Sequence, residues 1–337
     1  MNSFDLNKHF KTYKKNLFFD DKTYAQLLSD VGCFSHVLSL LPSSLKAIAL
    51  KIHSPYLAFV AILASIKENK LPILLSHLEA DSQIEKLRTQ ISFEKVIIDQ
   101  DVINSFSASN PSTLFSEFNF DEGRLVIFSS GSTNLPKGIV LSFNNLYFSA
   151  KGFSEYFNQK ENETSLMNLP HHHVGGLMIL WRAFFSGGNL TTNLDHPIDY
   201  ISLVPLQLKK MLDDPNKLLI LKKIKTILVG GSRFQETLKD EAIKLGLPIF
   251  ETYGMTETTS LVTINGNILP YREIELDDEG FFIIKGLTLA LGFYVQNIFY
   301  SYQAQWYKTS DIGFKDKKGA LHFKERADLI FISGGEI

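Results

Sequence analysis

The stretch LVIFSSGSTNLPKGIVLS, residues 125–142, decides which fold the sequence predicts. Its apolar run ends at Ser129, and a loop rich in Ser, Gly and Thr follows and reaches Lys137 and Gly138. The run is typical of a buried strand, and the amides, hydroxyls and lysine charge of the loop suit a polyphosphate. A Walker A loop does not fit, because Pro136 precedes the lysine and glycine follows it. An ordinary polar turn is the structural alternative.

On both sides of this stretch, helical patterns alternate with short apolar runs. The segments 21–41 and 54–69 predict amphipathic or buried helices, and 46–52 and 71–76 predict strands. This alternation is typical of a parallel α/β layer. It returns at 222–231 and 247–254, with a helix beginning near Phe234. Each of these later strands ends in glycine or a turn, where ligands bind in open parallel sheets.

Beyond about residue 266 the pattern changes to short alternating runs separated by glycine-rich or charged turns. The runs are 272–278, 280–286, 306–314 and 320–332. They predict a small antiparallel β subdomain. We therefore expect a layered α/β region over 1–265, a β-rich subdomain over 266–326 and the start of a hinge over 327–337.

Composition limits the class of protein. The chain has 337 residues, of which 45% are hydrophobic, so it is not disordered. Its 34 basic and 36 acidic residues give no basic field for nucleic acid. The single cysteine, Cys33, excludes an intramolecular disulfide and favours a reducing compartment. Residues 1–20 do not form a secretory signal, and no apolar run is long enough to span a bilayer, so we expect a cytoplasmic protein without membrane contact.

Residues 129–138 resemble the signature loop of the adenylate-forming acyl-CoA synthetases and ligases, with Asn134 where glycine is usual. Three further family motifs follow in the same order, at ETYGMTET (251–258), YKTSDIG (307–313) and KERADLIFISGGE (324–336). The resemblance is dense from about residue 124 onward and thin before it. It implies the large N-terminal domain of an adenylate-forming enzyme, in which parallel sheets and helices form layers beside a small antiparallel subdomain.

The resemblance implies a nucleotide site. It assigns phosphate binding to the loop residues Ser129, Ser130, Gly131, Ser132, Thr133 and Lys137. Tyr253 would pack on adenine beside Gly254, and Thr256 would touch the α-phosphate. Glu257 would hold Mg²⁺, because a carboxylate next to ATP is repulsive unless a divalent ion bridges them. Taken alone, this segment is a Tyr-Gly turn that opens a helix.

The last two motifs complete this site. The resemblance implies that Asp311 accepts hydrogen bonds from the ribose hydroxyls, which suits an acceptor-only carboxylate. Ser310 replaces the usual glycine of that motif. Arg326 would reach ribose or phosphate, and Asp328 would be the pivot of the hinge. Without the resemblance, both motifs are charged strand ends.

Within the family, the resemblance is greatest to the o-succinylbenzoate:CoA ligases of menaquinone biosynthesis. It depends on NLPHHHVGGLMILWRAFFSGGNL (168–190), LVGGSRF (228–234) and ADLIFISGGE (327–336). The resemblance implies that His173 lines the acyl pocket, and a satisfied histidine at a strand end is the alternative. Consecutive histidine side chains diverge and lack acidic or cysteine partners at ligand spacing, so we do not expect zinc.

The acyl pocket has two further candidates. Gly230, Gly231 and Ser232 end a predicted strand and would let a flat acyl group lie against the backbone, although such glycine pairs also mark turns. Arg182 follows the apolar run LMILW, so helical packing carries its guanidinium inward, where it needs an anion. It would bind the carboxylate of o-succinylbenzoate that is not activated. In the alternative, its stem packs and its head reaches solvent.

The resemblance implies an AMP-forming acid–thiol ligase that uses ATP, Mg²⁺ and CoA and forms an acyl-adenylate from a small carboxylic acid. Lys137, Thr256, Glu257 and His173 would be its catalytic residues. Family members carry a C-terminal lid with a further lysine, and we expect this chain to lack the lid and to be impaired without it. The alternatives are a ligase for another aryl, fatty or amino acid and a non-catalytic nucleotide-binding homologue. A homodimer stays open.

Overall fold

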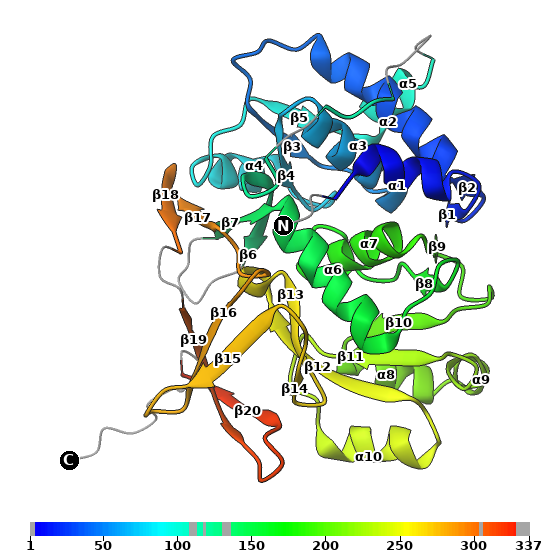
Figure 1. Cartoon of the computed structure of the whole chain (residues 1–337), viewed down its shortest axis with the longest axis vertical. Helices are drawn as coiled ribbons and strands as arrows, with labels where there is room; N and C mark the ends of the chain where they lie inside the picture. The colour runs from blue at the N-terminus through cyan, green and yellow to red at the C-terminus, as the bar shows by residue number, and fades with distance from the viewer. Residues whose placement is uncertain (1–3, 108–112, 117–118, 130–135, 303–305, 328–337) are drawn as a thin grey trace.

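The computed structural model describes residues 4–107, 113–116, 119–129, 136–302 and 306–327. Within these ranges the strands form three sheets, and helices cover them (Figure 1). No helix of the described residues is long and apolar enough to cross a membrane. The loop residues Ser130, Gly131, Ser132 and Thr133 and the hinge residue Asp328 lie outside the described residues.

A seven-stranded sheet follows the order β18-β17-β7-β6-β4-β3-β5. Its strands are β3 (Ala47–Leu50), β4 (Leu71–Leu74), β5 (Lys95–Ile97), β6 (Gly123–Ser129), β7 (Lys137–Ser142), β17 (Gly292–Val295) and β18 (Ile298–Ser301). β5, β3, β4 and β6 are parallel, whereas β7, β17 and β18 add antiparallel pairs at one edge. The predicted phosphate loop therefore connects two antiparallel neighbours, β6 and β7.

A nine-stranded sheet follows the order β14-β13-β12-β11-β10-β8-β9-β1-β2. Its strands are β1 (Leu17–Phe19), β2 (Lys22–Thr23), β8 (Thr164–Leu166), β9 (Asn189–Thr191), β10 (Tyr200–Leu203), β11 (Thr226–Val229), β12 (Ile249–Met255), β13 (Ser260–Ile264) and β14 (Asn267–Ile268). β8, β10, β11 and β12 run parallel, so their carboxyl ends lie at one edge of the sheet. This edge is where ligand sites form in parallel sheets.

A four-stranded antiparallel sheet follows the order β15-β16-β19-β20. Its strands are β15 (Arg272–Leu276), β16 (Phe281–Gly286), β19 (Tyr307–Lys315) and β20 (Leu321–Arg326). The expected small antiparallel sheet is confirmed. The strands β17 and β18 lie between β16 and β19 in the sequence but do not join this sheet. β17 pairs with β7 of the seven-stranded sheet, and β18 pairs with β17. The division of the chain at residues 265 and 326 stays a prediction.

The helices follow the expected alternation with strands. They are α1 (Leu6–Tyr13), α2 (Tyr24–Ser39), α3 (Pro55–Lys67), α4 (Asp81–Arg88), α5 (Asp99–Ser105), α6 (Phe143–Phe157), α7 (Val174–Ser186), α8 (Pro205–Leu212), α9 (Pro215–Leu221), α10 (Glu236–Lys244) and the 3-10 turn η1 (Thr256–Thr258). α2, α3 and α10 confirm the helices predicted from the sequence. Local signals set their ends: Ser54 caps α3 before a proline, and Ser142 and Asn145 cap α6 reciprocally.

Helix α7 lies inside the main core. Its residues Trp181 and Phe184 are fully buried and pack with Phe59 of α3 and Phe143 of α6. The hydroxyl of Tyr24 on α2 donates toward the carbonyl oxygens at the end of α7, with distances of 2.9 Å to Ala183 and 3.1 Å to Phe184. These carbonyls also accept from the backbone amide of Gly187 at the cap of the helix, and the added hydroxyl contact fixes the end of α7 against the N-terminal layer.

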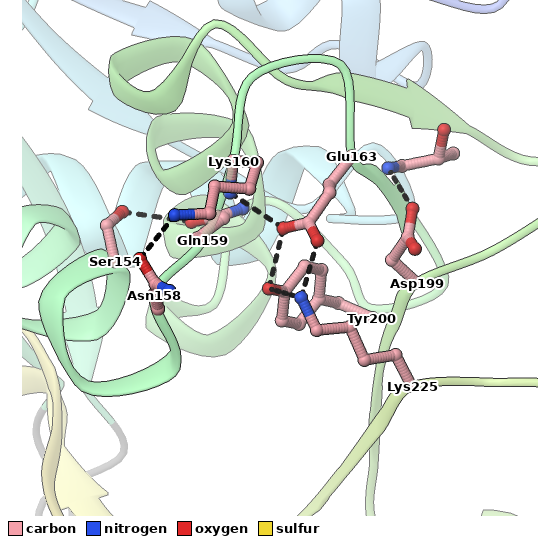
Figure 2. A network of polar contacts seen from close by, with 9 residues as sticks. Ser154, Asn158, Gln159, Lys160, Glu163, Asp199, Tyr200 and Lys225 are labelled. Atoms are coloured by element: carbon pink, nitrogen blue, oxygen red, sulfur yellow. Dashed lines mark hydrogen bonds and ion pairs between the residues drawn. The ribbon is translucent and has the colours of Figure 1, made fainter.

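A second set of contacts joins the segment that follows α6 to the nine-stranded sheet (Figure 2). The carboxylate of Glu163 accepts hydrogen bonds from the Lys160 amide and the Tyr200 hydroxyl, each at 2.8 Å, and pairs with Lys225. Burial raises the pKa of Glu163, but the bond from Lys225 and the other donors outweigh it, so the net shift is downward. β8, β10 and β11 are thereby held together at their amino ends, opposite the edge where their carboxyl ends lie.

We expect Tyr24→Phe to lower the free energy of unfolding by about 0.5–1.5 kcal/mol, because the buried hydrogen bonds from its hydroxyl to the carbonyl oxygens of Ala183, Phe184 and Gly188 are lost. Urea unfolding followed by circular dichroism measures the change. Tyr300→Phe is the matched control, since the Tyr300 side chain is exposed on β18. An equal change in both variants would contradict the role of the Tyr24 hydroxyl.

Candidate active site

A cavity of about 360 Å³ lies at the carboxyl ends of β10 and β11, beside β12 and the start of α7. Most of its surface is apolar or backbone, with a few polar groups facing inward, as in sites for small molecules. It is lined by Leu169, Pro170, His173, Val174, Gly175, Gly176, Arg182, Ser202, Leu203, Val204, Leu228, Gly230, Gly231, Thr252, Gly254, Thr256, Ser260 and Leu261.

Two glycines shape the wall of this cavity. A Cβ atom on Gly230 would stand 2.1 Å from Oγ1 of Thr252, and one on Gly254 would stand 2.0 Å from the carbonyl oxygen of Ser260. No real Cβ atom tolerates such distances, so any side chain would push the wall apart. Gly231 also lines the cavity, whereas Ser232 is exposed and does not line it.

His173 precedes α7 as its N-cap residue and lines the cavity. Burial lowers the pKa of its imidazole. Its ring contacts that of His172, with 4.4 Å between the centroids. His171 is buried and does not line the cavity, so the three consecutive histidines face different surroundings. In the described part of the chain, no group of three or more His, Cys, Asp or Glu residues is arranged to hold a metal ion.

Arg182 brings a positive charge to the cavity wall from within the core. Its side chain is only 5% exposed, so its head is buried instead of reaching solvent. The guanidinium donates to Oγ of Ser260 at 3.2 Å and lies over the ring of Phe153. None of the ion pairs formed by the described residues includes it, and its Nε has no partner there. Burial lowers the pKa of Arg182 to about 9.

A cluster of polar residues next to the cavity unites three of the motifs. The Tyr253 hydroxyl on β12 donates to Asp311 on β19 at 2.7 Å, and Arg326 on β20 lies 3.5 Å from the other oxygen of that carboxylate. The Tyr253 ring contacts the ring of Phe282 edge to face and is stacked with that of Phe323. Because β12 belongs to another sheet than β19 and β20, only the packing of the two sheets brings these residues together.

Glu257 on η1 faces the same cluster. Burial raises the pKa of its carboxyl, while the nearby charges of Lys137 and Arg326 oppose the rise and Asp311 adds to it. Lys137 begins β7 and lies 4.9 Å over the ring of Phe293. The signature-loop lysine and the three later motifs therefore meet around Glu257. A partly buried carboxylate next to a second one favours a bound cation.

Two further predicted residues, Thr256 and Ser129, have distinct surroundings. Thr256 lines the cavity and immediately precedes Glu257. Ser129 ends β6, and its hydroxyl oxygen is buried with no partner among the described residues. A phosphate oxygen is the kind of acceptor that would satisfy such a group.

The sequence alone did not single out Thr252, Ser260, Phe153 or Arg272. Thr252 and Ser260 line the cavity, and Phe153 contacts the Arg182 guanidinium. Thr252 lies within the ETYGMTET segment and Ser260 follows it by two residues, so their position was a usable signal. Phe153 and Arg272 belong to distant segments whose local patterns predict only a helix face and a strand.

Fold and site define the class of protein. A family model described as AMP-binding enzyme matches residues 57–279, more than half of the chain. The chain belongs to this family.

Among individual relatives, a 2-succinylbenzoate--CoA ligase of Bacillus cereus is 27% identical over 255 residues, which cover 65% of this chain and 53% of the relative. The chain thus spans about half the length of the curated relatives it matches.

Solved structures share the fold. Wild-type E. coli MenE, bound to a phenylether-linked analogue of OSB-AMS, superimposes with a TM-score of 0.79 at 21% identity, over 97% of this chain and 80% of that one. The N-terminal domain of FACL13 from Mycobacterium tuberculosis gives a TM-score of 0.84 at 16% identity, over 95% and 98%. The expected large-domain architecture of layered parallel sheets is confirmed.

We expect the stability of the protein to fall as pH drops from about 6.5 to about 4, in part because His171 is buried. Burial lowers the pKa of His171 from 6.5 to about 4, against the opposing hydrogen bond with Ile52. In this pH window the unfolded chain therefore binds a proton at His171 that the folded protein does not bind, which costs about 3 kcal/mol of stability once the pH falls to about 4.

Urea unfolding of wild type and His171→Asn at pH 7 and pH 4 measures this contribution. The variant should lose less stability on acidification than the wild type does. His36→Asn, at an exposed position on α2, is the control. The same acid sensitivity in all three proteins would contradict the assignment.

Proposed function

We propose that this protein is an ATP-dependent acid:CoA ligase that acts through an acyl-adenylate, with 2-succinylbenzoate as the acid. The observation that carries this proposal is that two adjacent residues, Thr256 and Glu257, face the two parts of the site. Thr256 faces the cavity that contains the buried Arg182 charge, and its neighbour Glu257 faces the cluster of Lys137, Asp311 and Arg326. An acid in the cavity and a nucleotide on the cluster would meet at this turn.

In the first step, the acid carboxylate attacks the α-phosphorus of ATP, pyrophosphate leaves, and an acyl-adenylate remains. Asp311 accepts hydrogen bonds from the ribose hydroxyls. The Tyr253 ring, whose hydroxyl donates to Asp311, packs on the adenine. Lys137, Arg326 and the donors of the 129–133 loop stabilise the phosphate charge, with Thr256 at the α-phosphate. The protein contributes mainly orientation and charge, because two anions must be held together before they react.

Mg²⁺ fits this site, because burial and the nearby Asp311 raise the pKa of the Glu257 carboxyl, and a bound cation would offset this cost of its negative charge. When bound, the ion supplies the positive charge that lets a carboxylate stand next to the phosphates. Glu257 would hold it together with phosphate oxygens. The remaining cations, Lys137 and Arg326, balance the charge that the ion does not neutralise.

In the second step, the thiolate of CoA attacks the acyl carbon and AMP leaves, which gives the thioester. His173 lies at the cavity wall before α7, and its lowered pKa keeps the ring neutral near pH 7. A neutral ring next to the acyl group adds no charge that would compete with Arg182. The apolar residues of the wall exclude water from the hydrolysable anhydride.

Arg182 supports a dicarboxylic acid as the substrate. A buried guanidinium without a carboxylate partner is costly unless an anion of the ligand completes it. 2-Succinylbenzoate retains one carboxylate when the other is activated, and guanidinium binds carboxylate with two parallel hydrogen bonds. Gly230 and Gly231 present backbone to the cavity, against which a flat ring would lie.

Replacement of Asp311 tests the nucleotide site. We expect Asp311→Asn to weaken AMP binding by about 10- to 100-fold in calorimetry, since the amide no longer accepts from both ribose hydroxyls as a charged group. Asp240→Asn, exposed on α10, should bind AMP as the wild type does. Unchanged affinity in the Asp311 variant would refute the ribose assignment.

Pyrophosphate exchange against a panel of carboxylic acids tests the activity. We expect exchange that depends on 2-succinylbenzoate, and we expect Arg182→Lys to raise KM for this acid at least about tenfold while KM for ATP changes little. Arg88→Lys on α4 is the control. Exchange with a different acid would indicate a related ligase, and AMP binding without any exchange would indicate a nucleotide-binding homologue.

A further inference from the structure

A second buried arginine lies behind Arg182. Arg272, the first residue of β15, is 5% exposed and does not line the cavity. Its guanidinium donates to the carbonyl oxygen of Pro270 at 2.7 Å and to Oγ of Ser149 at 3.0 Å, and its Nε has no partner among the described residues. Burial, and then the charge of Arg182, lower the pKa of Arg272 to about 9.

Two like charges are therefore buried near each other, and no ion pair within the described residues includes either one. Burial of an ion without a counter-ion is unfavourable, and a second ion of the same sign makes it more so. Proteins rarely keep such an arrangement in a core for stability alone. An anion that enters from the cavity would stabilise both charges, although only Arg182 can touch it.

A chain of hydrogen bonds joins the two arginines. Arg272 donates to the Ser149 hydroxyl, and this hydroxyl donates to the carbonyl oxygen of Thr259 at 2.6 Å. The next residue, Ser260, accepts from Arg182 at 3.2 Å. Gly152 of α6 leaves the space for Arg272, because a Cβ atom there would lie 2.6 Å from its nitrogen.

The turn in the middle of this chain is strained. Thr259 and Ser260 have φ values of 52° and 80°, in the left-handed region that side chains rarely adopt and β-branched residues least of all. Neighbouring contacts hold it: Oγ1 of Thr258 donates to the Ser260 carbonyl at 3.0 Å, and Oγ1 of Thr259 donates to the Thr288 carbonyl at 2.8 Å. The Ser260 hydroxyl is thereby fixed toward Arg182.

We propose that Arg272 is a positioning and specificity-determining residue of the acid site. Through Ser149 and the strained 259–260 turn it holds the Arg182 guanidinium at the cavity wall, and its charge raises the preference for acids that keep a second negative charge after activation. The inference rests on the proposed function and names the substrate class of that site, namely dicarboxylic acids. Arg272 itself does not touch the substrate.

The test compares two ligands that differ by one carboxylate. The probes are the sulfamoyl-adenosine conjugates of 2-succinylbenzoate and of 4-oxo-4-phenylbutanoate, which lacks the ring carboxylate. Calorimetry on the whole chain gives the dissociation constant of each conjugate. The ratio of the constant for the 4-oxo-4-phenylbutanoate conjugate to that for the 2-succinylbenzoate conjugate measures the preference for the second carboxylate. We expect Arg272→Met, which keeps the volume but removes the charge, to reduce this ratio about tenfold, and Arg272→Lys to restore most of it.

Two further variants make the outcome specific. Ser149→Ala removes only the hydroxyl that connects Arg272 to the turn, and it should reduce the ratio about threefold even if Arg272→Met does not fold. Arg124→Met removes another buried arginine, which pairs with Glu122 at 2.9 Å in the other sheet, and should leave the ratio unchanged.

The outcomes separate this inference from the proposed function. If the wild type prefers the dicarboxylic conjugate and Arg272→Met and Ser149→Ala prefer it equally, the role of Arg272 is refuted and the proposed function stands. If the wild type binds AMP and both conjugates without preference, the dicarboxylic substrate class is refuted as well. If it binds neither AMP nor a conjugate, the proposed function fails and this inference with it.

Discussion

The constraint on which the site depends is a positive charge buried at the wall of the cavity. The guanidinium of Arg182 comes from α7, the helix at the centre of the main core, so it cannot move to solvent without disrupting that core. It contacts a serine hydroxyl and an aromatic ring, and neither of these carries the negative charge that would neutralise the guanidinium. The cavity wall therefore carries a fixed positive charge, which favours a negatively charged ligand.

The turn from Thr256 to Ser260 gives this charge its chemical context. At one end it presents Thr256 to the cavity and Glu257 to the polar cluster, and at the other it holds the hydroxyl that orients Arg182. Gly254 makes the turn possible, because the chain at Ser260 passes too close to position 254 for any side chain. In the proposed function, recognition of the acid and recognition of the nucleotide would both depend on this single short segment.

Much of this arrangement was predictable from local patterns. The parallel layer, the small antiparallel sheet and the candidates Arg182, Gly230 and Gly231 follow from the local pattern, and His173 and Thr256 follow from the family resemblance. The cavity gathers these five residues. Ser232 had the same local support but lies exposed beyond the strand, because the chain turns away after Gly231. The departure of β17 and β18 to another sheet had no local signal, since an edge strand has the same alternation in either sheet.

The sequence by itself determined the order of the motifs, the helices and strands that carry them and the inward direction of Arg182, because these depend on neighbours within one or two turns of chain. Only the tertiary structure decided which polar groups meet. Arg272 and Ser149 are 123 residues apart, as Ser149 and Thr259 are 110, and no local pattern specifies such a pairing. Their contact exists because α6, β13 and β15 pack together, and the buried charges of Arg182 and Arg272 follow from that packing.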